Sequence, residues 1–222
     1  MLELKGIHKS YQHQRGPVPV LRDLDFSVKK GEKVAILGPS GSGKSTLLSL
    51  LSGLDQPTGG KILLNGQDLA HLGERALTQL RAENLGIVFQ QFHLMSHLTA
   101  LENVALPLRI LRRDEPFARA ERALARVGLE GRLDHFPHQM SGGECQRTAI
   151  ARAMVAEPPL ILADEPSGNL DGRTGDAVMK ILFDCVNDTQ STLILVTHNE
   201  TLATWCSRRL LLKGGQLHEL SR

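Results

Sequence analysis

Apolar and polar residues alternate over residues 2–7 and 18–28. A period of two places successive side chains on opposite faces, which predicts two half-exposed strands that pair antiparallel. The pattern changes at residues 33–37, where an apolar run predicts a buried strand. Residues 44–52 then carry helical character. The chain is therefore expected to pass from an antiparallel β region into a strand followed by a helix.

Two further short strands are predicted at 61–64 and 85–89, with a helix at 74–81 between them. Strand signals then vanish, and apolar residues recur at helical spacing, as in Leu101, Val104, Leu108, Leu111 and the segment 118–127. This spacing predicts a mainly helical subdomain, roughly 91–157, which Pro158 and Pro159 end.

Beyond this point strands are predicted at 160–163 and 193–196, with a helix at 175–186 between them and a closing hairpin at 210–217. Buried strands alternating with helices imply a parallel sheet covered on both faces. The predicted fold class is α/β. A single domain over 1–222 would hold a mainly parallel core (1–90 and 158–222), an N-terminal antiparallel β subdomain and the helical subdomain.

Composition and charge limit the classes of molecule that the chain is expected to bind. The net charge of +2, from 26 basic and 24 acidic residues, shows no electrostatic footprint for nucleic acid, so no nucleic-acid partner is expected. Cys145, Cys185 and Cys206 have neither metal-site nor CxxC spacing, which fits a reduced cytosolic chain. The N-terminus lacks a signal-peptide layout, and no run of ~18 apolar residues occurs, so another chain would supply any membrane part.

A glycine-rich loop joins the strand predicted at 33–37 to the helix predicted at 44–52. It satisfies G-x-x-x-x-G-K-S/T in Gly38, Pro39, Ser40, Gly41, Ser42, Gly43, Lys44 and Ser45, with Thr46 following. Glycines let successive amides point inward, and the helix start attracts anions. Lys44 would reach the β- and γ-phosphates, and the Ser45 hydroxyl can ligate Mg²⁺. The loop predicts a P-loop NTPase core that binds a nucleoside triphosphate.

Two acids, Asp164 and Glu165, follow the buried strand predicted at 160–163. Ligands of open α/β sheets bind at the carboxyl ends of the strands. Asp164 suits the Mg²⁺ shell, through water, and Glu165 suits a general base that orients or deprotonates the attacking water. The alternative is an exposed acidic turn, since Pro166 follows directly.

A second glycine-rich motif occurs at Ser141, Gly142, Gly143 and Glu144. The ordered set of motifs resembles the ABC ATPases, the nucleotide-binding subunits of ABC transporters, over essentially the whole chain. The second motif resembles that family's signature loop. The resemblance implies a head-to-tail homodimer in which Ser141 and Gly143 contact the γ-phosphate of ATP bound to the opposite subunit. The alternative is a simple helix cap without a ligand.

Other residues match the family in order. Tyr11 matches the aromatic that stacks on adenine, with an ordinary packing role as the alternative. Gln90 matches the glutamine that touches Mg²⁺ and relays to the transporter partner, and Gln91 beside it could take that role. Asp171 closes the segment 167–171, which matches the loop that crosses the dimer interface.

His198 matches the histidine that contacts the γ-phosphate. The sequence departs from the family at two positions: Cys145 stands where glutamine is common, and Asn199 stands where aspartate is commoner. Cys145 lies beyond the implied phosphate contacts, so we expect it to alter packing more than catalysis. The change at Asn199 concerns fine tuning and not the reaction class.

The segments 88–104 and 164–171 resemble those of the lipoprotein-release and macrolide-export group, and within it the YbbA-type ATP-binding proteins. The resemblance implies an ATPase that hydrolyses ATP with Mg²⁺ and powers a separate integral membrane permease. The permease would dock near Gln90 to Asn103 and hold the chain on the cytoplasmic face of the inner membrane. Packing of the helical subdomain by Phe92, Leu94, Met95 and Leu98 is a compatible explanation of this segment.

Three other functions remain open. A soluble mechanical ABC ATPase acting on ribosomes or DNA would usually carry two cassettes or a long coiled-coil insertion, and this chain shows neither. A cell-division ABC ATPase of similar size is a close rival. A nucleotide-binding regulator without turnover is disfavoured because Lys44, Glu165 and His198 are all present.

Overall fold

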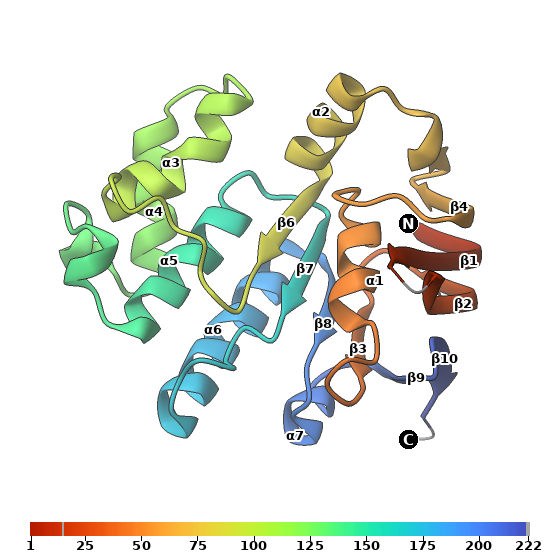
Figure 1. Cartoon of the computed structure of the whole chain (residues 1–222). Coiled ribbons are helices and arrows are strands. Elements are labelled where there is room, and N and C mark those ends of the chain that lie inside the picture. The colour runs from red at the N-terminus through yellow and green to blue at the C-terminus, as the bar shows by residue number, and fades with distance from the viewer. Residues whose placement is uncertain (15, 221–222) are drawn as a thin grey trace. The chain divides into compact units, whose positions relative to one another are not determined.

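A computed structural model describes residues 1–14 and 16–220, and the chain divides into two compact units (Figure 1). Unit 1 takes in residues 1–81 and the segment from residue 192 onward, and unit 2 takes in residues 82–191. The division of the domain predicted at 90/91 and 157/158 differs from this partition by contacts, and it stays a prediction.

Unit 1 begins with an antiparallel sheet in the strand order β2-β1-β4-β5. Its strands are β1 (Leu2–His13), β2 (Gly16–Val28), β4 (Gly59–Leu64) and β5 (Gln67–Asp68). The alternation that predicted the first two strands is confirmed, because Leu2, Leu4 and Ile7 are buried. Both strands are longer than predicted, and the pairing continues through several register shifts until His13 faces Gly16.

The second sheet segment of unit 1 has the order β10-β9-β3-β8. Its strands are β3 (Lys33–Leu37), β8 (Thr192–Val196), β9 (Arg208–Lys213) and β10 (Gln216–Glu219). β3 lies parallel between β8 and β9, and β9 and β10 form the predicted antiparallel hairpin. The other elements of this unit are α1 (Lys44–Leu51), the short turn η1 (Leu69–His71) and α7 (Glu200–Ala203), and α2 (Glu74–Asn84) begins in it. The sequence did not predict β5, η1 or α7.

Unit 2 contains the parallel pair β6 (Leu85–Val88) and β7 (Leu160–Asp164). Its helices are α3 (Ala100–Ile110), α4 (Pro116–Arg126), α5 (Gly142–Met154) and α6 (Gly172–Thr189), with short turns η2 (Glu130–Arg132) and η3 (Pro137–Gln139). α3 packs on α4 and α5, and α5 also contacts α6 and β6 (Figure 1). The mainly helical region is thus confirmed, as is the α/β class with its antiparallel N-terminal sheet.

Candidate nucleotide-binding site

The first glycine loop connects the buried strand β3 to α1, as the motif requires. Gly41 and Gly43 have φ of 76° and 101°, a region that side-chain-bearing residues rarely adopt. At Gly38 the constraint is space: an added Cβ would lie 2.6 Å from the Leu212 carbonyl oxygen and 2.7 Å from Ser42 Oγ. The loop therefore needs glycine at these three positions for two different physical reasons.

The start of α1 is built to receive an anion. Gly43 occupies the N-cap position without a side-chain cap, and the first turn holds no acidic residue. The amides of a helix start have no partner within the helix, so they attract negative charge. Lys44 is buried, and its Nζ donates to the carbonyl oxygens of Gly38 at 2.9 Å and Pro39 at 3.1 Å. An ammonium group thus lies inside the loop, where phosphate oxygens would be attracted to it.

Buried Ser42 Oγ has no hydrogen-bond partner among the described residues. A buried hydroxyl without a partner carries a desolvation cost, which an oxygen acceptor of a bound phosphate would offset. Ser40 and Ser45 are exposed and Thr46 is half-buried, beside the same loop. The chemistry of the loop fits a polyphosphate.

His198 comes from the strand next to the glycine loop. β3 and β8 run parallel with Ile36 opposite Val196, and the Thr197 amide donates to the Ile36 carbonyl oxygen at 3.2 Å. Parallel strands end at the same edge of a sheet, so the loop after Leu37 and the exposed His198 lie at one edge of this sheet. Asn199 then caps α7 by accepting from the Leu202 amide at 3.1 Å. Unit 1 therefore groups His198 with the glycine loop, although the two are over 150 positions apart in the sequence.

Tyr11 lies near the end of β1 and opposite Val18 of β2. Its side chain is 42% exposed, and its hydroxyl donates to Asp55 Oδ2 at 2.8 Å. Lys9 Nζ lies 4.7 Å from the centroid of the ring and 2.6 Å from Asp55 Oδ1. Partial burial raises the pKa of Asp55, but the hydrogen bonds from Lys9 and Tyr11 outweigh it and keep this pKa below its usual value. The ring is thus held in place by its edge, as a stacking platform requires.

In unit 2, Asp164, Glu165 and Gln90 lie at the carboxyl ends of β6 and β7. β6 and β7 run parallel with Val88 opposite Ala163, so the residues that follow each strand emerge side by side. Asp164 and Glu165 are both half-buried. Glu165 has φ of 43°, an unfavourable conformation for a residue with a side chain. Its carbonyl oxygen accepts from the Gly168 amide at 2.8 Å, which closes the turn that holds this conformation.

Gln90 is clasped by the segment 167–171 on the same edge of unit 2. Gln90 Nε2 donates to Asn169 Oδ1 at 3.1 Å, and Asn169 Nδ2 donates to the Gln90 carbonyl oxygen at 3.0 Å. A Cβ at Gly168 would lie 2.7 Å from Gln90 Nε2, so only glycine admits this approach. Gln91 is exposed. The structure thus connects Gln90, and not Gln91, by its side chain to the segment predicted to cross a dimer interface.

The second glycine motif forms the start of α5, where Ser141 is the N-cap. Ser141 Oγ accepts from the Glu144 amide at 3.3 Å, and the Ser141 amide and hydroxyl both donate to Glu144 Oε2 at 2.8 Å. Arg132 Nε donates to Glu144 Oε1 at 2.7 Å. These hydrogen bonds, from Arg132 first and Ser141 second, lower the pKa of Glu144 to about 2. Glu144 is therefore an anion that organises the motif, and its predicted contact with nucleotide stays a prediction.

The two glycines of this motif allow α6 and the residues just before it to approach closely. A Cβ at Gly143 would lie 2.6 Å from Thr174 Cγ2, and one at Gly142 would lie 3.2 Å from Leu170 Cδ2. Asp171 is the N-cap of α6 and accepts from the Thr174 amide at 3.1 Å. Hydrogen bonds from Thr174 lower the pKa of Asp171, which keeps it anionic. Ser141 and Gly142 stay exposed at the start of α5, where another chain can reach them.

Cys145 follows this motif but faces the interior. Its side chain is 6% exposed, and Sγ lies 3.4 Å from the Pro137 carbonyl oxygen. Burial raises the pKa of the thiol. This departure from the family therefore affects packing under α5.

The segment predicted to receive a permease is shaped by buried Asn103. Its side chain bonds both backbone groups of Met95, with the amide donating to the Met95 carbonyl oxygen at 3.1 Å. It also donates to the carbonyl oxygens of Leu98 and Thr99. Phe92, Leu94 and Leu98 are half-buried, and Met95 is 45% exposed. The segment thus has a fixed backbone with an apolar surface.

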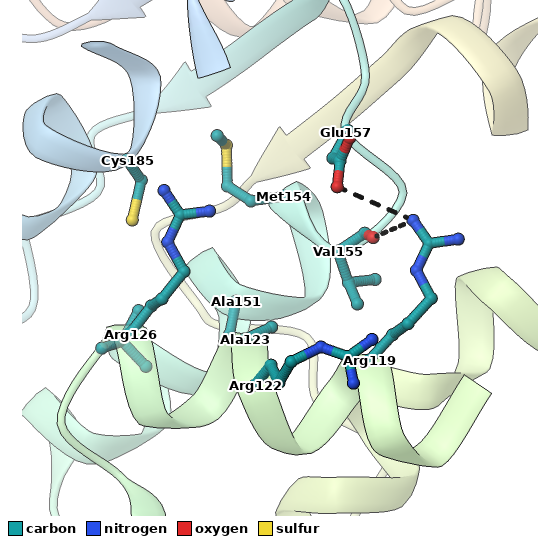
Figure 2. A pocket seen from close by; sticks show the side chains of 10 residues that line it. Arg119, Arg122, Ala123, Arg126, Ala151, Met154, Val155, Glu157 and Cys185 are labelled. Atoms are coloured by element: carbon teal, nitrogen blue, oxygen red, sulfur yellow. Dashed lines mark hydrogen bonds and ion pairs between the residues drawn. The ribbon is translucent and has the colours of Figure 1, made fainter. Parts of the chain in front are cut away.

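A separate hollow of about 230 Å³ lies in unit 2 among α4, the end of α5 and α6 (Figure 2). Arg119, Arg122 and Arg126 of α4 line it with apolar residues of α5. Arg119 donates to the Val155 carbonyl oxygen at 3.4 Å, and Arg126 pairs with Asp188 at 2.8 Å. None of the residues predicted for nucleotide chemistry lines this hollow, so it does not contribute to the candidate site.

Sequence reasoning missed Asp55, Arg132 and the roles of Asn103 and Asn169. Asp55 and Asn169 act through contacts far along the chain, as Asn169 does with Gln90, 79 positions away. The spacing Ser141-x-x-Glu144 was a usable signal, because serine followed three residues later by glutamate is the pattern of a capping box.

Comparison with known proteins shows the family. The family model described as ABC transporter matches residues 21–168. The lipoprotein-releasing system ATP-binding protein LolD of Shewanella oneidensis is 45% identical over 219 residues, covering 98% of this chain and 95% of that protein. LolD 2 of Caulobacter vibrioides is 46% identical, covering 100% of this chain and 98% of that protein.

A solved dimeric structure of the ATP-binding cassette MJ0796, in a post-hydrolysis state with ADP and Pi, superposes with a TM-score of 0.92. It is 39% identical, and the match covers 100% of this chain and 98% of that one. No helix among the described residues is long and apolar enough to cross a bilayer. With both glycine motifs at the starts of helices on this shared fold, the chain belongs to the ABC transporter family as one of its ATP-hydrolysing cassettes.

Proposed function

We propose that two copies of this chain close head-to-tail on two ATP molecules and drive a separate membrane permease. The observation that carries the proposal is the pair of glycine-bearing helix starts, one at α1 with Lys44 and one at α5 with exposed Ser141. The start of α1 attracts an anion and the start of α5 presents the exposed Ser141, yet the two belong to different motifs and different units. A dimer in which Lys44 of one copy and Ser141 of the other hold the same triphosphate uses both, as the dimeric state of the similar cassette supports.

Within this dimer Tyr11 stacks on adenine, the loop 38–46 surrounds the phosphates, and His198 contacts the γ-phosphate. Glu165 is the general base that positions the attacking water, and Asp171 lies at the interface. Ser45, Gln90 and Asp164 would hold Mg²⁺, since hydroxyl, amide and carboxylate oxygens are the hard donors that this ion prefers. When bound, the ion supplies charge neutralisation on the phosphate oxygens. Positioning and charge stabilisation by these residues account for the rate.

The permease docks on the segment from Gln90 to Asn103, where Asn103 fixes the backbone and Met95 is exposed. The names of the LolD relatives support a lipoprotein-releasing type of system as the work performed. In this arrangement the chain sits on the cytoplasmic face of the inner membrane through the permease.

The first experiment combines two variants in ATP-driven dimerisation, followed by light scattering. Glu165→Gln should bind ATP, lower kcat by roughly 10²-fold or more and accumulate as a dimer, because binding is kept while the base is lost. Ser141→Arg should prevent the dimer, because a long side chain blocks the second half of the site. Turnover like that of the parent chain in Glu165→Gln would remove Glu165 as the base. Unchanged dimerisation of Ser141→Arg would remove the shared site.

The second experiment tests the partner. A tagged chain purified from solubilised membranes should carry an integral membrane protein with it, identified by mass spectrometry. A Met95→Asp variant should lose that protein while keeping its own ATPase activity, because a charge would be buried in the docking surface. Recovery of the tagged chain without any membrane protein would overturn the proposal of a permease partner and favour a soluble mechanical ATPase.

A further inference from the structure

The five-residue segment from Phe89 to His93, which contains Gln90, has a strained backbone. Phe92 and His93 are consecutive non-glycine residues with φ of 59° and 49°. This left-handed region is disfavoured for residues with a Cβ, so two in succession persist only when other contacts impose them. Inside the segment, the rings of Phe89 and His93 stack with centroids 4.6 Å apart.

One side chain of α5 holds both strained residues. Arg152 Nη2 donates to the Phe92 carbonyl oxygen at 2.8 Å, and Arg152 Nη1 donates to the His93 carbonyl oxygen at 2.6 Å. None of the ion pairs among the described residues includes Arg152. Its planar fork is therefore committed to two adjacent carbonyl groups, a geometry that the single ammonium of lysine does not reproduce.

A second residue of α5 binds the other end of the same segment. Gln146 is fully buried, and its Nε2 donates to the Phe89 carbonyl oxygen at 3.3 Å. Gln146 and Arg152 thus bind the backbone on both sides of Gln90. The same helix begins at Ser141. α5 therefore carries the motif proposed to face the second ATP and also binds the segment proposed to face the permease.

We propose that Arg152 is a positioning residue that imposes the shape of the 89–93 segment and thereby aims Gln90. Its effect on hydrolysis rests on the proposed function, because Gln90 acts there. Motion of this segment would be transmitted through Arg152 to α5 and to Ser141 at its start. Loss of the fork would let Phe92 and His93 relax to common backbone conformations, and Gln90 would lose its aim while the glycine loop in unit 1 stayed intact.

The test compares Arg152→Lys with Arg147→Lys in the full chain. Arg147 is a matched control on the same helix, since its Nη1 also donates to two adjacent carbonyl oxygens, of Val127 at 3.0 Å and Gly128 at 3.3 Å. Amide hydrogen exchange without nucleotide should be about tenfold faster across 89–99 in Arg152→Lys and unchanged there in Arg147→Lys. In ATPase assays kcat should fall about tenfold in Arg152→Lys with KM for ATP within about twofold.

A rescue separates positioning from general stability. Glycine adopts positive φ without strain, so His93→Gly should recover most of the lost kcat in the Arg152→Lys background. If Arg152→Lys alone does not fold, the double variant should fold, and a double variant as unfolded as the single one overturns the proposal. Unchanged exchange over 89–99, or equal effects of the Arg147 and Arg152 variants, also overturns it. The exchange result needs neither ATP nor a permease, so it stands or falls separately from the proposed function.

Discussion

Replacing Glu144 by glutamine tests how much the charge of this residue stabilises the start of α5. The folded protein holds the pKa of Glu144 at about 2, against an ordinary value of 4.5. A difference of about 2.5 units corresponds to about 3 kcal/mol, at about 1.4 kcal/mol per unit. Arg132 is 45% exposed, so solvent screens part of this interaction. We therefore expect Glu144→Gln to lower the free energy of unfolding by about 2 kcal/mol at pH 7.

The lowered pKa of Glu144 fixes the direction in which this stability difference changes with pH. A carboxyl group with a lowered folded pKa stabilises the protein above its unfolded pKa, and that stability is lost as the pH falls through the folded pKa. The gap between the parent chain and Glu144→Gln should therefore be full above about pH 5 and shrink between about pH 4.5 and 2. Urea unfolding at steps of pH from 7 down to 3 measures this gap.

Glu130→Gln is the matched control, because Glu130 is an exposed glutamate of η2 with no hydrogen-bond or ion-pair partner among the described residues. It should change the free energy of unfolding by less than about 0.5 kcal/mol at any of these pH values. A gap for Glu144→Gln that is below about 0.5 kcal/mol at pH 7, or that is the same at pH 3 and pH 7, would refute the reasoning.

Two further predictions concern the core. Gly86→Ala should lower the free energy of unfolding by about 3 kcal/mol, because a Cβ would overlap the Ala153 carbonyl oxygen and lie 2.7 Å from Ile161 Cδ1. Gly172→Ala, where an added Cβ meets nothing within 4 Å, should be neutral or slightly stabilising in the same urea unfolding assay, and equal losses would contradict the packing argument. Burial raises the pKa of Cys206 to about 12, so the folded chain should not react there with a thiol reagent at pH 8, and labelling of Cys206 as fast as in urea would count against its burial.

Local patterns account for what could be predicted. The alternation at Leu2 and Leu4, resumed at Ile7 after a register shift, reports a strand with one buried face, and the spacing of Val104 and Leu108 reports a helix with one buried stripe. The loop around Lys44 was recognisable because its glycines, lysine and serine are contiguous and each has a local physical role. Short elements such as α7 were missed because four residues carry too little periodicity.

The sequence alone determined the α/β class, the nucleotide loop and the order of the motifs, since each is encoded within a short window of residues. Only the tertiary structure decided that Arg132 pairs with Glu144, and that Asn169 and Gln90 hydrogen-bond to each other. It also decided that Arg152 binds the backbone carbonyl groups of His93 and Phe92, which lie 59 and 60 positions before it in the sequence. These contacts depend on how α5, α6 and the end of β6 pack together. A hydrogen bond between distant segments leaves no periodic trace in either of them, because its geometry exists only after the helices have docked.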